Sequence, residues 1–179
     1  MQNPLPHRLS LVLGGARSGK SRYAESLFTE APGPWIYLAT AEARDDEMAE
    51  RVREHRARRG SEWRMIEAPL DLATAMSEAG ETPVLIDCLT LWLTNVMLAE
   101  TDLDVEIARL LQALEETPGP VVAVSNEVGL GIVPDTPLGR RFRDAQGRLN
   151  QQVAAIADRV VLMTAGIPLT VKPQYAGGR

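Results

Sequence analysis

The sequence is poor in the residues that build disulfides and metal clusters. It contains a single cysteine, Cys88, so no disulfide can form within the chain. Only two histidines, His7 and His55, accompany it, and these side chains are too few for a Cys/His zinc set. The sequence therefore predicts a fold that is held by its core, without covalent or metal cross-links.

Long apolar runs and an excess of positive charge are also missing. No stretch approaches the roughly 20 apolar residues of a membrane-spanning helix, and the N-terminal run MQNPLPHRLSLVLGG has too short an apolar part for a signal peptide. With 19 basic and 24 acidic side chains the formal net charge is −5, which disfavours nucleic acid and anionic membranes as partners. We therefore expect a cytoplasmic protein that has no membrane span, binds no nucleic acid and acts on small molecules.

Low-complexity and linker segments are lacking as well. The 14 glycines and 12 prolines follow no repeating period, and no stretch is rich enough in Gly, Ser or Pro to divide the chain. With 45% hydrophobic residues, a chain of this length can bury roughly 70% of its unfolded surface. The sequence therefore predicts one domain over residues 1–179, with a frayed tail at Gln174–Arg179.

Short aliphatic runs alternate with longer amphipathic segments, which is the pattern of an α/β sheet covered by helices on both faces. Most of these runs are apolar throughout, as central strands should be. Strands are predicted at Leu9–Leu13, Trp35–Ala39, Arg64–Glu67, Pro83–Asp87, Pro120–Ser125, Arg159–Met163 and, after a break at Gly166-Ile167-Pro168, Leu169–Lys172. Helices are predicted at Lys20–Glu30, Asp45–Arg59, Pro69–Glu78, Leu89–Ala99, Leu103–Glu116 and Pro137–Ala157, with Asp102 and Thr136 capping the last two.

The first predicted strand leads into Gly14–Ser21, whose sequence GGARSGKS fits the phosphate-binding pattern G-x-x-x-x-G-K-[ST]. Glycines let such a loop turn its backbone N–H groups toward an anion, and the helix that follows adds the positive end of its dipole. Here Lys20 reaches the β- and γ-phosphates of a nucleotide, and the hydroxyl of Ser21 coordinates Mg²⁺. The alternative is a glycine-rich turn that matches by chance, which the order of strand, loop and helix disfavours.

An apolar run that ends in a carboxylate, Val84–Asp87, predicts a second acidic group at the site. In P-loop proteins such a carboxylate lies beside the phosphate loop and binds Mg²⁺ directly or through water. The alternative is an aspartate that only caps the next helix. Together with the phosphate loop, the metal-binding interpretation is favoured.

The segment Asp45–Gly60 begins acidic and ends basic, as a helix aligned with its own dipole does. Met48, Val52 and His55 share one face of that helix, and arginines surround His55. His55 is then either a partly buried residue of a packed face or a nucleophile. As a neutral imidazole it can attack phosphorus, with the arginines stabilising the phosphate charge. The spacing alone leaves both interpretations open.

Three further segments carry weaker signals. Val124–Pro134 follows a strand at the sheet edge where α/β proteins bind ligands, so it is either a site loop or a plain connection. Leu138–Gln151 is a basic helix interrupted by Gly147, whose arginines either line an anionic substrate site or are solvated. Leu89–Val96 is apolar on nearly every side, which predicts burial or a subunit contact.

Together these segments resemble the bifunctional adenosylcobinamide kinase / adenosylcobinamide-phosphate guanylyltransferase family of cobalamin biosynthesis. The resemblance spans almost the whole chain and rests on GGARSGKS at Gly14–Ser21, Leu38-Ala39-Thr40, DDEMAERVREHR at Asp45–Arg56, Asp87, SNEVGLGIVP at Ser125–Pro134 and RRFRDAQGRLNQ at Arg140–Gln151. It implies a P-loop NTPase of the RecA-like type, with a mostly parallel sheet flanked by helices and a C-terminal antiparallel strand pair. It also implies a homotrimer.

The activity that the resemblance implies has two steps. The family phosphorylates the aminopropanol hydroxyl of adenosylcobinamide with ATP or GTP, and then transfers GMP from GTP to that phosphate through a GMP–histidine intermediate, releasing pyrophosphate. By this resemblance His55 is the nucleophile, Lys20 is catalytic, and Mg²⁺ accompanies the nucleotide at Ser21 and Asp87. The nucleotide-binding residues implied in the same way are Gly14, Gly15, Ala16, Arg17, Ser18, Gly19, Lys20, Ser21, Ala39, Thr40, Ala41, Arg56, Ala57, Arg58, Arg59, Glu67 and Asp87.

The chain departs from some relatives at two positions. Glu54 precedes a single His55 where those relatives have two adjacent histidines, and Asp87 stands where others have Glu, which leaves open whether it contacts metal or ribose. Two other functions stay as alternatives: a simple P-loop kinase of another small hydroxyl substrate, with His55 structural, and a non-catalytic GTP-binding regulatory module. Neither of them requires the segment Asp45–Arg56.

Overall fold

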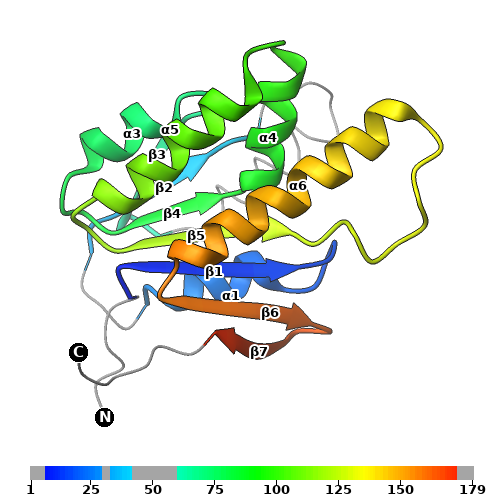
Figure 1. Cartoon of the computed structure of the whole chain (residues 1–179). Helices are drawn as coiled ribbons and strands as arrows, with labels where there is room; N and C mark the ends of the chain where they lie inside the picture. The colour runs from blue at the N-terminus through cyan, green and yellow to red at the C-terminus, as the bar shows by residue number, and fades with distance from the viewer. Residues whose placement is uncertain (1–6, 30–32, 42–59, 173–179) are drawn as a thin grey trace, which may run out of the picture.

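The structure, a computed structural model, describes residues 7–29, 33–41 and 60–172. The strands within these residues are β1 (Leu9–Gly14), β2 (Trp35–Ala39), β3 (Trp63–Glu67), β4 (Val84–Asp87), β5 (Val121–Asn126), β6 (Arg159–Thr164) and β7 (Ile167–Lys172). They form a seven-stranded sheet in the order β3-β2-β4-β5-β1-β6-β7 (Figure 1). Neighbouring strands are parallel except for β6 and β7, which pair antiparallel.

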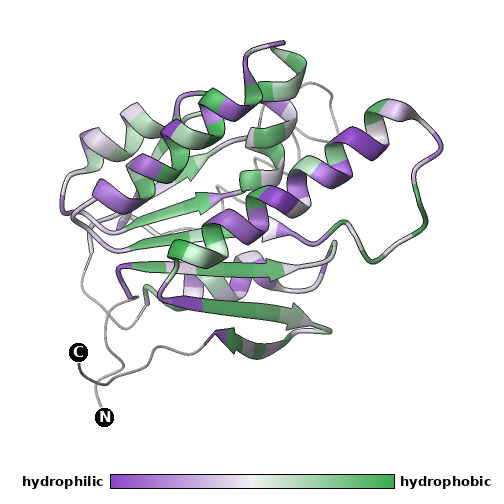
Figure 2. Ribbon diagram, in the orientation of Figure 1, coloured by the Kyte–Doolittle hydropathy of each residue, from purple (hydrophilic) through white to green (hydrophobic). Residues whose placement is uncertain are grey.

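Helices cover both faces of this sheet and form two apolar layers with it. The helices are α1 (Lys20–Ser26), α3 (Leu72–Ala79), α4 (Leu89–Leu98), α5 (Leu103–Glu116) and α6 (Pro137–Ile156). The last four lie on one face and α1 lies on the other (Figure 1). One core cluster, which includes Trp92 and Leu149, fills the first layer, and a second, which includes Phe28 and Val124, lies on the α1 face. Figure 2 shows the central strands as hydrophobic and the outer helix faces as largely hydrophilic.

Many of the predicted elements are confirmed. Trp35–Ala39 and Leu103–Glu116 agree to the residue with β2 and α5. The side chain of Asp102 accepts hydrogen bonds from two backbone N–H groups of α5, and that of Thr136 accepts one from α6, so both predicted N-caps are present. The apolar segment Leu89–Val96 is buried within this chain as part of α4.

The predicted bounds were wrong for the first two described helices. Helix α1 ends at Ser26, before the predicted Glu30, because the next residues make tighter turns that bring Phe28 into the core. Helix α3 starts at Leu72, after the predicted Pro69, because the side chain of Asp71 caps it there. The predicted helix Asp45–Arg59 lies outside the described residues, as does the tail Gln174–Arg179.

Two predicted interruptions were also wrong. Helix α6 runs through Gly147 without a break, because its apolar side packs along the sheet on either side of that glycine. The break before the last strand falls at Ala165-Gly166, where both residues have positive φ, so β7 begins at Ile167 and includes Pro168. A proline is tolerated there because β7 is an edge strand. Among the described helices, none is long and apolar enough to cross a membrane.

The sheet topology brings the C-terminal ends of three parallel strands to one edge. Strand β5 lies between β1 and β4, with Asn126 opposite Gly14 and Val124 opposite Asp87. The carboxylate predicted to lie beside the phosphate loop is therefore separated from β1 by one strand. The end of β5 fills the position between them.

Candidate nucleotide-binding site

The phosphate loop connects β1 to α1, and its backbone requires glycine at two positions. A Cβ atom at Gly14 would lie 2.9 Å from the carbonyl oxygen of Met163 on the neighbouring strand. Gly19, the residue before α1, has a φ of 92°, in the left-handed region that favours glycine. The two glycines that the sequence pattern fixes thus allow the tight turn from strand to helix.

Neighbouring segments brace this loop. The N–H group of Gly166, in the β6–β7 turn, donates a 3.0 Å hydrogen bond to the carbonyl oxygen of Ser18. The N–H group of Glu127, just after β5, donates a 3.1 Å hydrogen bond to the carbonyl oxygen of Gly14. The loop is therefore held from the β6–β7 turn and from the end of β5.

Lys20 and Ser21 open helix α1 directly after the loop. The Nζ atom of Lys20 donates a 2.9 Å hydrogen bond to the carbonyl oxygen of Gly15, so the ammonium group lies against the loop. An anion bound by the loop amides would meet this positive charge. The structure thus brings together the residues predicted at Gly14–Ser21.

Asp87 closes β4 at the same edge of the sheet. Its Oδ2 atom accepts a 3.1 Å hydrogen bond from the hydroxyl of Tyr37. Burial, followed by the Asp87 carboxylate, raises the pKa of the next residue, Cys88, to about 12, while the Lys20 ammonium acts in the opposite direction. Only β5 separates β4 from β1, so the Asp87 carboxylate and the phosphate loop lie at the same end of neighbouring strands.

Thr40 lies beneath this site with its hydroxyl directed into the chain. Its Oγ1 atom donates a 2.7 Å hydrogen bond to the carbonyl oxygen of Cys88 and accepts one of 2.7 Å from the N–H group of the same residue. The carbonyl oxygen of Thr40 accepts a 2.8 Å hydrogen bond from Nδ2 of Asn95. Thr40 therefore fixes the turn that follows Asp87, and its predicted nucleotide contact stays a prediction.

The other predicted contacts lie farther along the sheet. Ala39 stands in register between Glu67 on β3 and Asp87 on β4, and Ala41 follows two residues later. Four strand spacings, roughly 19 Å, separate β3 from β1. Glu67 and the phosphate loop would therefore contact different parts of one ligand. His55 and the predicted contacts at Arg56, Ala57, Arg58 and Arg59 lie outside the described residues.

Two oxygen-bearing side chains at this edge fit a magnesium ion. Over residues 7–29, 33–41 and 60–172, no three His, Cys, Asp or Glu side chains come together as a metal-binding cluster. Mg²⁺ commonly needs no such cluster, because it takes one or two protein oxygens and completes its shell with phosphates and water. The hydroxyl of Ser21 and the carboxylate of Asp87 supply this type of donor.

A buried polar network behind β5 was not predicted from the sequence. The hydroxyl of Ser125 donates a 2.7 Å hydrogen bond to Oδ1 of Asn150, and Nε2 of Gln146 donates 2.9 Å hydrogen bonds to both of these oxygens. Gln146 and Asn150 come from α6, for which the sequence predicts a role only for the arginines. The signal that could have found them is a pair of amides four residues apart on a helix face that is otherwise apolar.

The fold and the phosphate loop together define a P-loop nucleotide-binding protein of the RecA-like type. Among solved structures, the chain resembles flagellar accessory protein FlaH from Methanocaldococcus jannaschii, with a TM-score of 0.54 and 12% identity over 98% of this chain and 83% of that one. The RadB recombinase gives a TM-score of 0.50 with 16% identity, over 86% of this chain and 73% of the other. At this identity the likeness shows the fold alone.

Sequence comparison gives the family. The chain belongs to the cobinamide kinase / cobinamide phosphate guanyltransferase family, whose model matches residues 10–171. It is 50% identical to the bifunctional adenosylcobalamin biosynthesis protein CobP of Pseudomonas aeruginosa over 90% of this chain and 96% of the relative. It is 42% identical to the corresponding protein CobU of Salmonella typhimurium over 90% and 98% of the two chains. The family predicted from the sequence motifs is confirmed.

Proposed function

We propose that this chain phosphorylates adenosylcobinamide with ATP or GTP and then transfers GMP from GTP to adenosylcobinamide phosphate, releasing pyrophosphate. The observation that carries the proposal is the phosphate loop Gly14–Ser21 at the same sheet edge as Asp87, in a chain of the family described by these two activities. Both steps begin with a nucleoside triphosphate, so one phosphate-binding edge can serve them in turn.

In the kinase step, the aminopropanol hydroxyl of adenosylcobinamide attacks the γ-phosphorus, which forms a phosphate ester and releases the nucleoside diphosphate. The amides of Gly14–Ser21 hold the phosphates, and Lys20 stabilises the charge on the phosphoryl group during transfer. Ser21 and Asp87 are the residues that would hold Mg²⁺, which when bound offsets the charge of the phosphates.

In the guanylyl transfer step, we assign the nucleophile from the family resemblance to His55, which lies outside the described residues. A neutral imidazole nitrogen of His55 attacks the α-phosphorus of GTP, pyrophosphate leaves, and GMP stays on the histidine as a phosphoramidate. A phosphate oxygen of adenosylcobinamide phosphate then attacks that phosphorus, which forms adenosylcobinamide-GDP and frees His55. Nearby arginines, Arg56, Arg58 and Arg59, stabilise the phosphate charge.

Residues farther along the edge are proposed to hold the rest of the nucleotide. Ala39 ends β2, Thr40 and Ala41 follow it, and Ala57 and Glu67 complete the set implied by the family. Because Glu67 lies roughly 19 Å across the sheet from β1, we assign it to the nucleoside end of the ligand. This assignment is tested by Glu67→Gln, which should weaken GTP more than free triphosphate.

We further propose that the chain forms one catalytic domain, assembles as a homotrimer and works in the cytoplasm, where nucleoside triphosphates are made. Ile167, Leu169 and Val171 on the edge strand β7 are each more than half exposed. An apolar edge strand is a liability in an isolated subunit, and a subunit contact would cover it. Light scattering should give the mass of three 19.6 kDa chains. A monomer over the same concentrations would contradict the trimer.

The function is tested by labelling the protein with GTP that carries radioactive phosphorus at the α position, in the presence of Mg²⁺. The label should remain on denatured protein, survive alkali and be lost in acid, which is the behaviour of a phosphoramidate. His55→Ala should abolish the label, whereas His7→Ala, the matched control at the other histidine, should retain it. A folded protein that binds GTP and takes no label would contradict the guanylyl transfer step.

A further inference from the structure

The loop that joins β5 to α6 carries large apolar side chains in water, and the proposed function gives them no role. Leu130 is 87% exposed, Ile132 is 96% exposed and Val133 is 59% exposed. Leu138, in the first turn of α6, is also more than half exposed. We term these four residues the β5–α6 apolar group. Single exposed apolar residues are ordinary, but several large ones so close together in a chain indicate a surface that binds a partner or a ligand.

Hydrogen bonds hold this loop at both of its ends. At its start, Oε1 of Glu127 accepts a 2.6 Å hydrogen bond from the N–H group of Gly129. At its end, the guanidinium of Arg140 donates 2.9 Å hydrogen bonds to the carbonyl oxygens of Pro134 and Asp135. The apolar side chains are therefore presented by a segment that is anchored on either side of them. Such anchoring lowers the entropy that the loop would lose on binding.

The loop starts at the nucleotide-binding edge of the sheet. The N–H group of Glu127 donates a 3.1 Å hydrogen bond to the carbonyl oxygen of Gly14, the first residue of the phosphate loop. From there the loop extends outward from the end of β5 before it returns to α6 (Figure 1). The surface that carries Leu130 and Ile132 therefore begins next to the phosphate loop and lies outside the sheet.

A second set of exposed apolar residues, on β7, differs from this one in its backbone. Ile167, Leu169 and Val171 lie on an edge strand, where another strand can pair, and we assign them to a subunit contact. The β5–α6 loop contains no strand with which a partner could pair. It offers apolar side chains beside a nucleotide site, which favours a ligand of that site as the group that covers them.

The acceptor of the kinase step has the size and the chemistry to reach this group. Its hydroxyl has to approach the γ-phosphorus from the side opposite the departing nucleoside diphosphate. The rest of the corrinoid, a macrocycle broader than a nucleotide base, then lies outside the sheet edge. The rim of a corrin ring carries methyl groups as well as amide side chains, so contact with apolar residues removes apolar surface of both from water.

We propose that Leu130, Ile132 and Val133 contact the corrin ring of adenosylcobinamide while its aminopropanol arm reaches the phosphate loop. Leu138 extends the same apolar group onto α6. Because Glu127 bonds the loop to Gly14, the ring contact and the phosphate site belong to one connected edge, which would hold the hydroxyl near the phosphate. The inference rests on the proposed function for the identity of the ligand, and the family description names cobinamide.

The test measures two dissociation constants by calorimetry, with Mg²⁺: that of a non-hydrolysable GTP analogue, and that of adenosylcobinamide with the analogue bound. A double variant with Leu130→Ser and Ile132→Ser should weaken adenosylcobinamide by about 10-fold or more, because two large apolar side chains lose their contact. The analogue should bind within about twofold of wild type. A second variant, with Leu130→Met and Ile132→Met, keeps the apolar surface and should bind both ligands as wild type does.

The matched control replaces two apolar residues that are exposed elsewhere. Leu98 on α4 and Val105 on α5 are each about half exposed, so Leu98→Ser with Val105→Ser removes apolar surface far along the chain from the loop. This control should leave both dissociation constants unchanged. The serine substitutions in the loop should leave the melting temperature near that of the wild type, because side chains as exposed as Leu130 and Ile132 have little packing to lose.

Each outcome decides the proposal. Wild-type affinity for adenosylcobinamide in the loop serine variant would overturn it, as would equal weakening of both ligands. A smaller assembly of that variant in light scattering would assign the group to a subunit contact and also overturn it. A wild-type protein that makes the corrinoid products while the serine variant binds corrinoid equally well would contradict only this inference. A wild-type protein that binds adenosylcobinamide through these residues but makes no product would contradict only the proposed function.

Discussion

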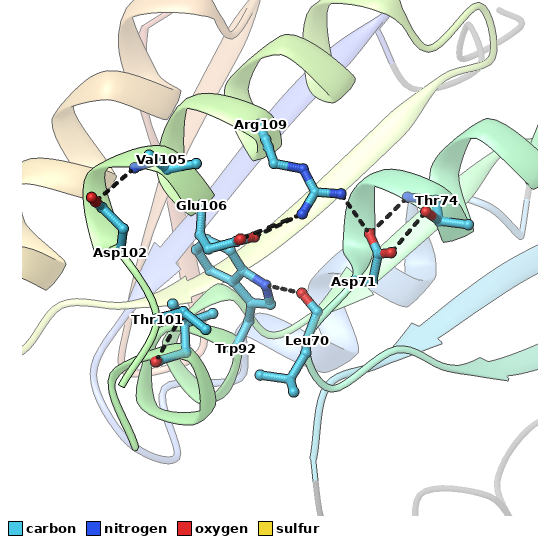
Figure 3. Close-up of polar contacts among 10 residues, drawn as sticks. Leu70, Asp71, Thr74, Trp92, Thr101, Asp102, Val105, Glu106 and Arg109 are labelled. Carbon is cyan, nitrogen blue, oxygen red and sulfur yellow. Dashed lines mark hydrogen bonds and ion pairs between the residues drawn. The ribbon is translucent and has the colours of Figure 1, made fainter. Parts of the chain in front are cut away.

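Two polar regions of this molecule differ in how their hydrogen-bonding groups are used. On the face of the sheet covered by α3–α6, a group of side chains and one backbone carbonyl pair with one another through hydrogen bonds and ion pairs (Figure 3). We term this group the α3–α5 clasp, and it comprises Leu70, Asp71, Thr74, Trp92, Glu106 and Arg109. There the indole of Trp92 donates to the carbonyl oxygen of Leu70 at 2.8 Å, and Arg109 contacts both Asp71 and Glu106. At the sheet edge around Gly14, by contrast, the buried atoms Ser18 Oγ and Asn126 Oδ1 have no partner in the described chain.

This difference separates stability from ligand recognition. Groups paired within the chain, as in the α3–α5 clasp, contribute to the free energy of unfolding whether or not a ligand is present. Groups left unpaired at the Gly14 edge lower the stability of the free chain, and we expect a bound ligand that pairs them to reduce that cost. Substitutions at the Gly14 edge should therefore lower activity, whereas substitutions in the α3–α5 clasp should lower the free energy of unfolding.

The largest effect on activity is expected at the phosphate loop. Lys20→Ala should lower the rate of both transfer steps by roughly 100-fold to 1,000-fold, the loss typical of removing one group that stabilises transition-state charge. The hydrogen bond from the Lys20 ammonium to the carbonyl of Gly15 is exposed to solvent. Its loss should therefore change the free energy of unfolding by less than about 0.5 kcal/mol. Product formation and urea unfolding on the same preparation check both. Wild-type turnover in this variant would remove Lys20 from the mechanism.

The next effect is expected in the α3–α5 clasp and should appear in stability. Trp92 is 1% exposed, so Trp92→Ala should lower the free energy of unfolding by roughly 3–5 kcal/mol. Trp92→Phe, the matched variant, keeps most of the packing and removes only the donor to Leu70, and should cost about 1–3 kcal/mol. GTP affinity of the folded protein should be unchanged in both. A loss of affinity with intact stability would reverse the comparison.

A smaller effect is expected at the N-cap of α3. The pKa of Asp71 is lowered by the backbone N–H of Thr74 and then by its hydroxyl. Because the folded pKa lies below the unfolded one, this contribution is present above the unfolded pKa and is lost as the pH falls through the folded pKa. Asp71→Ala should cost about 1 kcal/mol at pH 7, and the cost should shrink in acid. Asp71→Asn, also a cap, should show a smaller loss at pH 7 in urea unfolding. Because the Asn cap does not titrate and the Asp cap weakens in acid, this difference from the wild type should shrink as the pH falls.

The smallest effect is expected for the exposed ion pairs of the same clasp. Arg109 and Asp71 are each about half exposed and 3.5 Å apart. Arg109→Ala should lower the free energy of unfolding by less than about 0.5 kcal/mol, and added salt should remove that difference. Thermal unfolding in low and high salt tests it. A loss above about 1 kcal/mol that persists in high salt would be of the size expected for a buried ion pair. It would contradict the small contribution to stability that we expect from these charges.

The phosphate loop and the α/β class could be predicted because their signals are local. The pattern at Gly14–Ser21 needs only neighbouring residues, and Asp102 and Thr136 cap helices through backbone groups within three positions. The bounds of β7 were missed because its pairing with β6 across a two-residue turn decides them, and a proline at an exposed edge does not prevent that pairing.

The polar network behind the site could not be predicted in the same way. Ser125 and Asn150 are 25 positions apart and meet only because α6 crosses the end of β5. The position of Asn126 between Asp87 and the loop follows from strand order, in which β5 comes between β1 and β4. Neither fact has a local signal, since strand order is set by packing of the whole sheet.

The central claim is that the phosphate loop Gly14–Ser21 binds the nucleoside triphosphate for both transfer steps. It is tested most directly by following the corrinoid substrate. Adenosylcobinamide would be incubated with the wild-type protein, Mg²⁺, ATP and GTP, and its products followed in time by mass spectrometry. Our account predicts that adenosylcobinamide phosphate appears first and adenosylcobinamide-GDP follows, together with pyrophosphate. Unchanged adenosylcobinamide, from a folded protein that binds GTP, would contradict it.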